Sequence, residues 1–160
     1  MSLPILGTRH QRWPDEAACA AAATALAEHR SLADACVELH GPLGAGKTTF
    51  VRHLLHALGV QGSIKSPTYT LMEPYEVARD GAPLAIAHFD FYRFDDPQEW
   101  EDAGFRDVFA APGLKLVEWP EKAAAFLPVP DLRLHIEAFA DESRDVRIDA
   151  HTARGAELLS

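Results

Sequence analysis

Phosphate chemistry is indicated by one eight-residue stretch, Gly41 to Thr48, with the sequence GPLGAGKT. It matches G-x-x-x-x-G-K-[ST], in which glycines let backbone N–H groups approach a phosphate that a side chain would block. Lys47 can contact the outer phosphates as a point charge, and the Thr48 hydroxyl can bind Mg²⁺. A helix that starts here directs its positive N-terminal end at the same anion. The stretch therefore predicts a phosphate-binding loop, or P-loop.

The segments on both sides of this loop have the character that a P-loop requires. Residues 35–40 form a short, largely apolar run that predicts a strand. After the loop, apolar residues recur with helical spacing from Phe50 to Leu58, and Gly59 is a typical helix C-terminal residue. Strand, glycine-rich loop and helix, in this order, are the context in which the motif binds nucleotide phosphates.

Two further apolar runs end in a carboxylate. Residues 114–117 lead into Glu118, and residues 84–87 lead through His88 to Asp90. Ligands of α/β sheets bind outside the carboxyl ends of the strands, and a P-loop needs acids that hold Mg²⁺ or its waters and orient the attacking water. Both acids are therefore candidate site residues with separate roles, the alternative for each being a solvated strand-end residue.

Three more residues near these candidates each have two interpretations. Thr68 can sense the γ-phosphate and Mg²⁺, as the threonine of a GTPase switch loop does, or it can belong to a plain turn. His88 can be a general base, although a histidine on an apolar strand is more often a hydrogen-bonded core residue. Arg93 can neutralise transition-state charge or pair with Asp95 or Asp96 on the surface. The sequence leaves these alternatives open.

An alternation of strands and helices must position these residues. We expect a short edge strand over residues 3–8 and an Ala-rich helix that starts near Pro14, Asp15 and Glu16 and extends to about His29. Further expected elements are a hairpin turning at Asp80-Gly81, a short helix opened by Asp96-Pro97 and anchored by Trp100, two alternating strands around residues 132–136 and 146–148 with a turn at 141–143, and a helix from Thr152. The predicted fold class is α/β: a P-loop nucleoside triphosphate hydrolase fold with a mixed β-sheet flanked by helices.

Composition limits the alternatives. The 160 residues are 48% hydrophobic and 24% charged, as expected for one globular domain spanning residues 1–160. The net charge of −9 argues against broad nucleic-acid binding, which needs clustered Lys and Arg. Cys19 and Cys36 form no C-x-x-C pair and are expected to be buried. Because no apolar run reaches membrane-span length and no secretory pattern is present, we expect a cytoplasmic protein without a membrane association.

Four motifs together identify a family. The G-x-L-G-A-G-K-T-T loop, SPTYT at 66–70, H-x-D-x-Y-R at 88–93 and VEW at 117–119 occur in this order. The set closely resembles the TsaE family, the bacterial ATPases of tRNA threonylcarbamoyladenosine biosynthesis, from about Trp13 to Arg147. Many families share the P-loop, whereas H-x-D-x-Y-R combined with S-P-T and E-W is specific.

The resemblance implies a function and its partners. Members are small cytoplasmic ATPases that use ATP and Mg²⁺, dock on the TsaD–TsaB pair, and meet tRNA only indirectly. TsaD transfers a threonylcarbamoyl group to adenosine 37 of tRNAs that read codons beginning with A. ATP hydrolysis by the family is thought to reset that complex between turnovers rather than to make the modification bond.

The resemblance also implies residue roles. The nucleotide-binding set would be Glu16, Leu43, Gly44, Ala45, Gly46, Lys47, Thr48, Thr49 and Arg144. The catalytic set would be Lys47, Thr68, Asp90 and Glu118. Thr48 with Glu118 would hold Mg²⁺, Asp90 is the family's further functional acid, and Thr68 is the switch-loop threonine. One departure bears on this set, because Cys19 stands where the family commonly has Thr.

Other functions fit the sequence less well. A GTPase commonly selects guanine with N-K-x-D, and the chain contains no asparagine. A small-metabolite kinase could use Asp90 to deprotonate an acceptor hydroxyl, but no helical segment carries the paired arginines of a phosphate-covering lid. A nucleotide-sensing module with negligible turnover is the remaining alternative, because P-loop proteins without a well-placed arginine hydrolyse slowly.

Overall fold

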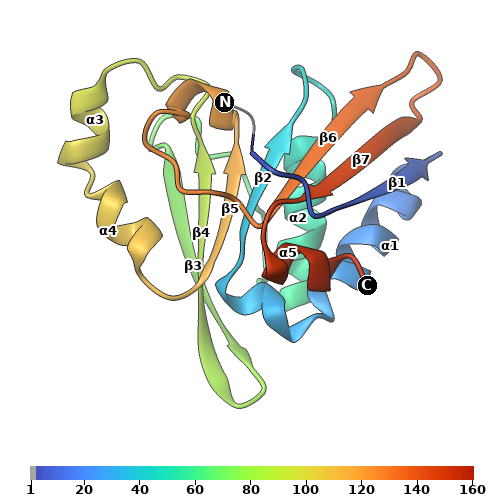
Figure 1. The fold of residues 1–160 in the computed structure, drawn as a ribbon, viewed down its shortest axis with the longest axis horizontal. Helices are drawn as coiled ribbons and strands as arrows, with labels where there is room; N and C mark the ends of the chain where they lie inside the picture. The colour runs from blue at the N-terminus through green and yellow to red at the C-terminus, as the bar shows by residue number, and fades with distance from the viewer. Residues whose placement is uncertain (1–2) are drawn as a thin grey trace.

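A seven-stranded sheet forms the frame of the computed structural model, which describes residues 3–160 (Figure 1). The strand order is β1-β7-β6-β2-β5-β4-β3. The strands are β1 (Gly7–Trp13), β2 (Cys36–His40), β3 (Met72–Arg79), β4 (Ala82–Asp90), β5 (Leu114–Glu118), β6 (Leu132–Ala138) and β7 (Arg144–Ala150). The helices are α1 (Glu16–Ala27), α2 (Lys47–Leu58), α3 (Pro97–Asp102), α4 (Phe105–Ala110) and α5 (Ala153–Leu158), with 3₁₀ turns at Arg30–Asp34 and Pro120–Ala123.

The sheet is mixed, as predicted. Its four central strands, β6, β2, β5 and β4, are parallel. The β3–β4 hairpin adds an antiparallel strand at one edge, and β7 and β1 add two at the other. The α/β class and the P-loop nucleoside triphosphate hydrolase fold, with a mixed sheet flanked by helices, are thereby confirmed.

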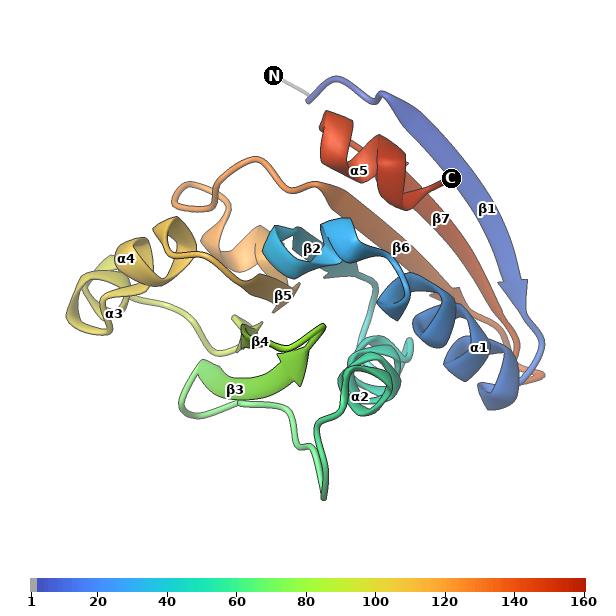
Figure 2. The same cartoon turned by 90° about the horizontal axis from the view of Figure 1, so that it is seen from below.

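Alternation along the strands divides the core into two layers. On one face, Leu116 of β5 and Leu134 of β6 pack with residues of α1 and α2, which lie side by side along the sheet (Figure 2). On the other face, Phe89 and Val117 pack with the aromatic side chains of α3 and α4, including Trp100. Since side chains point to one face at every second position, His88, Asp90 and Glu118 point to the face that α1 and α2 cover, which we call the α2 layer. This shared direction is what allows them to form one site.

Helices α1, α3 and α5 begin where the sequence predicted. The Asp15 carboxylate accepts from the Ala18 N–H at the start of α1, and Asp96 forms a capping box with Glu99 at the start of α3. The Thr152 hydroxyl caps α5. The expected buried anchor Trp100 and the two expected buried cysteines are also confirmed.

The structure corrects the bounds of one predicted strand and adds one helix that was not predicted. The predicted edge strand over residues 3–8 is wrong in its bounds: β1 lies at an edge, but it spans Gly7–Trp13. Pairing with β7 defines that span, and Pro4 lacks the N–H needed to pair. The polar sequence of β1 is satisfied across the ladder, as in the Thr8 hydroxyl donating to Asp149 at 2.9 Å. Helix α4 was not predicted. Within residues 3–160, no helix has the length and apolar character that crossing a bilayer requires.

Candidate functional site

The carboxyl ends of three parallel strands meet at one edge of the sheet. In the strand register, Leu39 of β2 is opposite Glu118 of β5, and Glu118 is opposite Asp90 of β4. The P-loop follows β2 directly and leads into α2 at Lys47. The structure therefore brings the loop and both predicted acids together at the edge where α/β sheets bind ligands.

The loop backbone requires its glycines. A Cβ on Gly41 (φ +153°) would lie 2.7 Å from the Ile136 carbonyl oxygen and 3.0 Å from the Ala45 Cβ. Gly44 and Gly46 also have positive φ, at 78° and 105°, and Gly46 is the N-cap of α2. Glycine alone combines this conformation with close approach of the backbone, so the loop presents its N–H groups as a phosphate-binding concavity.

Lys47 is a buried cation within this loop. Its ammonium donates to the carbonyl oxygens of Gly41 and Pro42 and lies 3.5 Å from the centroid of the Trp119 ring. Burial lowers the pKa of Lys47, while nearby carboxylates, Glu118 foremost, act in the opposite direction. The charge is thus held at the loop by its carbonyls, an aromatic face and acids.

Glu118 joins the P-loop helix to the strand beside it. This carboxylate is 1% exposed, and each of its oxygens has a partner. The Thr48 hydroxyl donates to Oε1 at 2.7 Å, and the His88 Nε2 lies 2.6 Å from Oε2. His88 is fully buried, and its Nδ1 has no hydrogen-bond partner among residues 3–160. His88 is therefore hydrogen-bonded to Glu118 and is not simply a core residue packed among apolar side chains.

Asp90 is bonded to the loop that precedes β3. Its carboxylate accepts from the Ser66 hydroxyl and, at 2.9 Å, from the Tyr92 N–H. Thr68 belongs to the same loop. With Asp90 and Glu118 it lines a cavity of about 440 Å³, whose wall is also formed by the P-loop residues Leu43 to Thr49. All four residues predicted as catalytic, including Lys47, therefore line one cavity.

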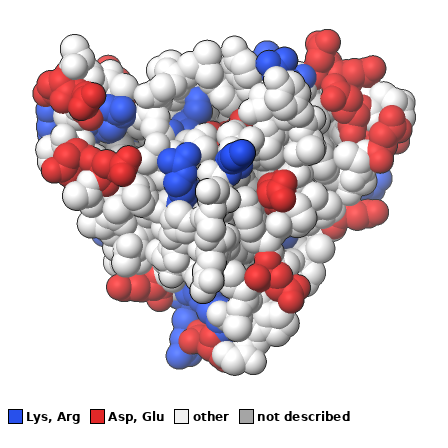
Figure 3. Space-filling model, turned by 180° about the vertical axis from the view of Figure 1, so that it is seen from behind, with Lys and Arg blue, Asp and Glu red and all other residues white. Residues whose placement is uncertain are grey.

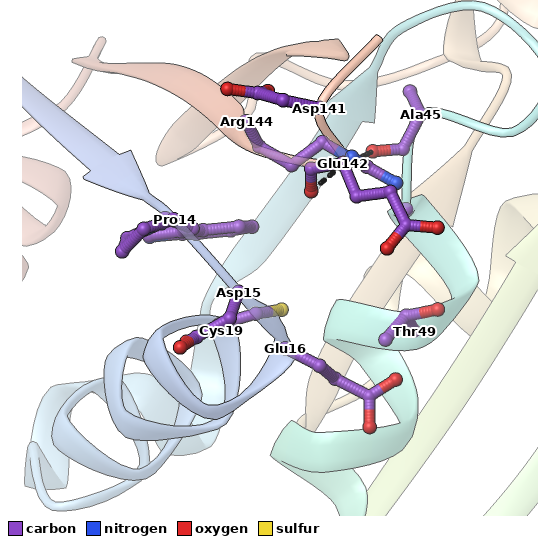
Figure 4. Close-up of a pocket in the computed structure, with 11 residues that line it drawn as sticks. Pro14, Asp15, Glu16, Cys19, Ala45, Thr49, Asp141, Glu142 and Arg144 are labelled. Atoms are coloured by element: carbon purple, nitrogen blue, oxygen red, sulfur yellow. Dashed lines mark hydrogen bonds between the residues drawn. The ribbon is translucent and has the colours of Figure 1, made fainter. Parts of the chain in front are cut away.

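A second cavity of about 320 Å³ adjoins the first (Figure 4). It is bounded by the start of α1, including Glu16 and Cys19, and by the β6–β7 turn. Arg144 and Thr49 line both cavities, as do Ala45 and Gly46, so the two spaces lie directly beside each other. The Arg144 Nε donates to the Ala45 carbonyl at 2.7 Å, which fixes the guanidinium at the boundary.

The walls of the second cavity differ in exposure. The Glu16 carboxylate is 71% exposed and lies 3.5 Å from the His53 ring nitrogen. Burial, and secondarily Glu16, raises the pKa of the Cys19 thiol to about 11. Cys19 is therefore a neutral, apolar wall residue near neutral pH. Both Glu16 and Arg144, which were predicted to approach a nucleotide, line this cavity, and their contact with a nucleotide stays a prediction.

Arg93 adopts neither predicted ion pair. Its guanidinium carbon lies 4.8 Å from the ring centroid of the exposed Tyr69, and within residues 3–160 it makes no salt bridge to Asp95 or Asp96. Arg93 is not among the residues that line the first cavity, the one beside the P-loop, which we call the phosphate-side cavity. A role at the transition state stays a prediction.

Sequence reasoning missed two contributors to the site. Ser66 was named only as part of a loop and of the SPTYT motif, although its hydroxyl bonds Asp90. Trp119 was seen only as part of a motif, whereas its ring faces Lys47 and its backbone has a left-handed φ of 55°. The sequence offered no signal for this conformation, which the structure reveals; a bulky residue held at positive φ frequently marks a functional site.

The oxygen ligands of the first cavity suit magnesium. Among residues 3–160, no group of three or more His, Cys, Asp or Glu side chains is arranged to hold a metal ion by itself. The candidate donors are the Thr48 hydroxyl and the carboxylates of Glu118 and Asp90. Mg²⁺ prefers oxygen, uses one or two protein carboxylates and completes its shell with phosphate and water. The residues present therefore fit Mg²⁺ bound together with a nucleotide.

Comparison with known proteins supports the motif resemblance. The family described as "Threonylcarbamoyl adenosine biosynthesis protein TsaE" matches residues 13–146. The tRNA threonylcarbamoyladenosine biosynthesis protein TsaE of Haemophilus influenzae is 44% identical over 124 residues, which cover 78% of this chain and 75% of that protein. The Bacillus subtilis protein of the same name is 38% identical over 112 residues, covering 70% and 67%. The crystal structure of Bacillus subtilis YdiB superposes with a TM-score of 0.77 at 27% identity, covering 99% of this chain and 95% of YdiB.

Proposed function

The chain belongs to the TsaE family of tRNA threonylcarbamoyladenosine biosynthesis proteins, and we propose that it serves this pathway as an Mg²⁺-dependent ATPase. Hydrolysis would reset the TsaD–TsaB complex between turnovers. We treat residues 1–160 as one P-loop ATPase domain, since a single sheet takes its outermost strands from residues 7–13 and 72–79.

The two adjoining cavities support ATP as the ligand. In our proposal the phosphates bind along the backbone of Leu43 to Thr49, within reach of Lys47, and the nucleoside occupies the second cavity between Glu16 and Arg144. The boundary position of Arg144 suits a group that passes from one cavity to the other. Their volumes, about 440 and 320 Å³, are of the size that ligand sites commonly have.

Hydrolysis requires a water to attack the γ-phosphorus while the bond to the β,γ-bridging oxygen breaks, which releases ADP and inorganic phosphate. Bound Mg²⁺ would neutralise charge on the phosphates, held by Thr48 and Glu118. We assign Lys47 to the negative charge that develops on the transferred group, and Asp90 with Thr68 to orientation of the water. The Ser66 and Tyr92 contacts of Asp90 support its role by fixing its carboxylate.

One observation carries the proposal: the Thr48 hydroxyl lies 2.7 Å from a Glu118 oxygen. These two residues are 70 positions apart in sequence and come from the P-loop helix and a neighbouring strand end. A hydroxyl and a carboxylate paired beside a P-loop are the two protein ligands that P-loop hydrolases use for Mg²⁺.

A partner is proposed because the site alone has limited means of stabilising transition-state charge. Within the described chain, Arg144 is the only arginine that lines the phosphate-side cavity, and it is bonded to the loop backbone. P-loop hydrolases without a well-placed arginine turn over several orders of magnitude more slowly than those that have one. We therefore propose weak activity alone and useful activity on TsaD–TsaB, in the cytoplasm.

Charge supports an indirect relation to tRNA. The face in Figure 3, which carries α1 and α2, mixes acidic and basic groups, and acidic residues gather at two of its corners. With a net charge of −9, the chain lacks the excess of cations from which phosphate-driven affinity arises. We propose that the tRNA is met through the partner complex.

Two measurements test the function. Calorimetry with ATP and ADP, each with Mg²⁺, should detect binding by the wild-type chain and none by Lys47→Ala, while Arg106→Ala, at an exposed position of α4, should bind normally. Phosphate release should be slow alone and change on addition of TsaD–TsaB. No adenine-nucleotide binding would refute the proposal, and no release even with the pair would favour a nucleotide-sensing module. Phosphate transfer to a small metabolite in place of release would favour a kinase.

A further inference from the structure

Among residues 3–160, His88 is the one histidine that is fully buried on the face of the sheet covered by α1 and α2, and strand alternation sets its direction. On β4, Leu84 and Ile86 precede it on the same face, and both belong to the apolar core. The register of β4 against β5 places His88 opposite Leu116, two positions before the Asp90–Glu118 pair and on the same face of the sheet. An imidazole in these surroundings is costly unless its polar atoms are bonded.

Its single hydrogen bond is directed at the acid. The His88 Nε2 lies 2.6 Å from Oε2 of Glu118, whereas Nδ1 has no partner within residues 3–160. The hydrogen-bond pattern therefore assigns the ring proton to Nε2, since a carboxylate only accepts. With Oε2 bonded in this way, the other oxygen, Oε1, is directed at the Thr48 hydroxyl 2.7 Å away.

We infer that His88 is a positioning residue for the metal ligand: it holds the Glu118 carboxylate so that Oε1 is presented beside Thr48, and it thereby sets the affinity of the nucleotide site for Mg²⁺. The inference rests on the proposed function, because it assigns Mg²⁺ to Thr48 and Glu118. Groups that orient a metal ligand through a hydrogen bond typically contribute 10- to 100-fold in metal affinity.

The residue type suits this role. A lysine or arginine at position 88 would also bond Glu118, but its charge would offset the carboxylate that is needed to attract Mg²⁺. A serine would be too short to fill the buried space. A neutral imidazole donates one hydrogen bond, leaves the acid its negative charge, and packs its remaining surface against apolar neighbours.

If His88 had a purely structural role, its substitutions would have different effects. In that case only shape and burial would matter, and every substitution would act on stability without changing the dependence of binding on Mg²⁺. The relevant quantity is therefore the ratio of ADP dissociation constants measured in EDTA and in saturating Mg²⁺, which we call the magnesium gain. It compares each variant with itself, so general loss of affinity cancels.

Three substitutions separate the two roles. His88→Gln places an amide N–H at the same number of bonds from Cα as Nε2, and so keeps the donor. His88→Asn is one methylene shorter and cannot reach Glu118, and His88→Leu has no donor. His135→Leu is the matched control, because it removes a histidine that lies 3.4 Å from a buried carboxylate, that of Asp149, on the opposite face of the sheet.

The experiment measures ADP binding by calorimetry in EDTA and in Mg²⁺, with melting temperatures for all variants. We expect the affinity in EDTA to be nearly unchanged, the magnesium gain to be largely kept in His88→Gln and His135→Leu, and the gain to fall by about 10- to 100-fold in His88→Asn and His88→Leu. Should His88→Leu fail to fold, the Gln and Asn pair gives the same comparison.

Each other outcome has a defined meaning. A full magnesium gain in His88→Asn or His88→Leu overturns the positioning role, and so does an equal loss in His88→Gln. If the wild-type chain binds ADP without any magnesium gain, the metal assignment of Thr48 and Glu118 fails together with this inference. If the wild-type chain binds no ADP at all, the proposed function itself fails.

Discussion

Replacing Glu118 by glutamine should remove the charge of the site while leaving its hydrogen bonds in place. The carboxylate accepts one hydrogen bond from Thr48 and one from His88, at 2.7 and 2.6 Å. In Glu118→Gln the amide oxygen can accept from the imidazole, and the amide N–H can donate to the Thr48 hydroxyl, whose own hydrogen is free to rotate. Glu118→Ala, in contrast, removes both acceptors.

The two variants should differ clearly in stability. Hydrogen bonds to a charged group contribute about 1.5–3 kcal/mol each and neutral ones about 0.5–1.5, so Glu118→Gln loses about 1–3 kcal/mol from its two bonds. Removing a carboxylate that is 1% exposed recovers a desolvation cost of several kcal/mol, which offsets that loss. Glu118→Ala leaves the buried His88 N–H unpaired, at about 1–3 kcal/mol, and adds a cavity. We therefore expect Glu118→Ala to be less stable than Glu118→Gln by about 3 kcal/mol.

The two variants should differ in stability but not in their loss of Mg²⁺-dependent ADP binding. Both variants lack the negative charge that attracts Mg²⁺, so the magnesium gain in ADP affinity should fall at least about 10-fold in each, while affinity in EDTA should be kept or improved because an anion near the phosphates is removed. Urea unfolding measures the first difference and calorimetry the second. A Glu118→Gln protein as unstable as Glu118→Ala would refute the hydrogen-bond account, and a Glu118→Gln protein with a full magnesium gain would refute the metal assignment.

Three further outcomes are expected. Arg144→Ala should lower ADP affinity about 10-fold, since a charge-assisted contact with the ligand at the boundary of the two cavities is lost, whereas Arg106→Ala, at an exposed position of α4, should not; calorimetry compares them. Cys19, whose thiol pKa is raised to about 11, should react with a disulfide reagent at pH 8 about 100-fold more slowly than a free thiol, and the rate should climb with pH up to that value. Gly155→Ala should destabilise the protein by about 1–2 kcal/mol without changing ADP affinity, because a Cβ there would lie 2.0 Å from the Asp131 carbonyl oxygen and overpacking exceeds the gain of about 1 kcal/mol in helix propensity; thermal unfolding tests this.

The P-loop and the strand-end acids were predictable because their signals are local. Glycines at 41, 44 and 46 specify a backbone path, and an apolar run followed by an acid specifies a strand end, without knowledge of the rest of the chain. The side-chain partners were not predictable in this way. Glu118 and Thr48 are 70 positions apart, and Glu118 and His88 are 30 apart, so their contacts depend on the strand order and register.

Tertiary contacts also explain the misplaced and missed elements. Helix α4 has six residues, as α3 and α5 do, but its N-cap is Gly104, which offers none of the side-chain capping that marked those two helices in the sequence. It is held by packing of Phe105 and Phe109 against Phe89. β1 carries an unbroken run of polar side chains, Thr8 to Arg12, that would suit a loop, and pairing with β7 makes it a strand. In both cases the partner, rather than the segment itself, decides the structure.

The antiparallel strands beyond the parallel core give the site its second half. β7 begins at Arg144, 99 positions after Ala45, whose carbonyl accepts from the guanidinium at 2.7 Å. The turn before it, with Asp141 and Glu142, forms the wall opposite α1 in the second cavity (Figure 4). In the proposed function the ends of the parallel strands would therefore provide the phosphate site, and the β6–β7 hairpin encloses the space beside it. Selection of the nucleoside should accordingly depend on this hairpin and on the start of α1, whereas the phosphate chemistry should depend on the ends of β2, β4 and β5.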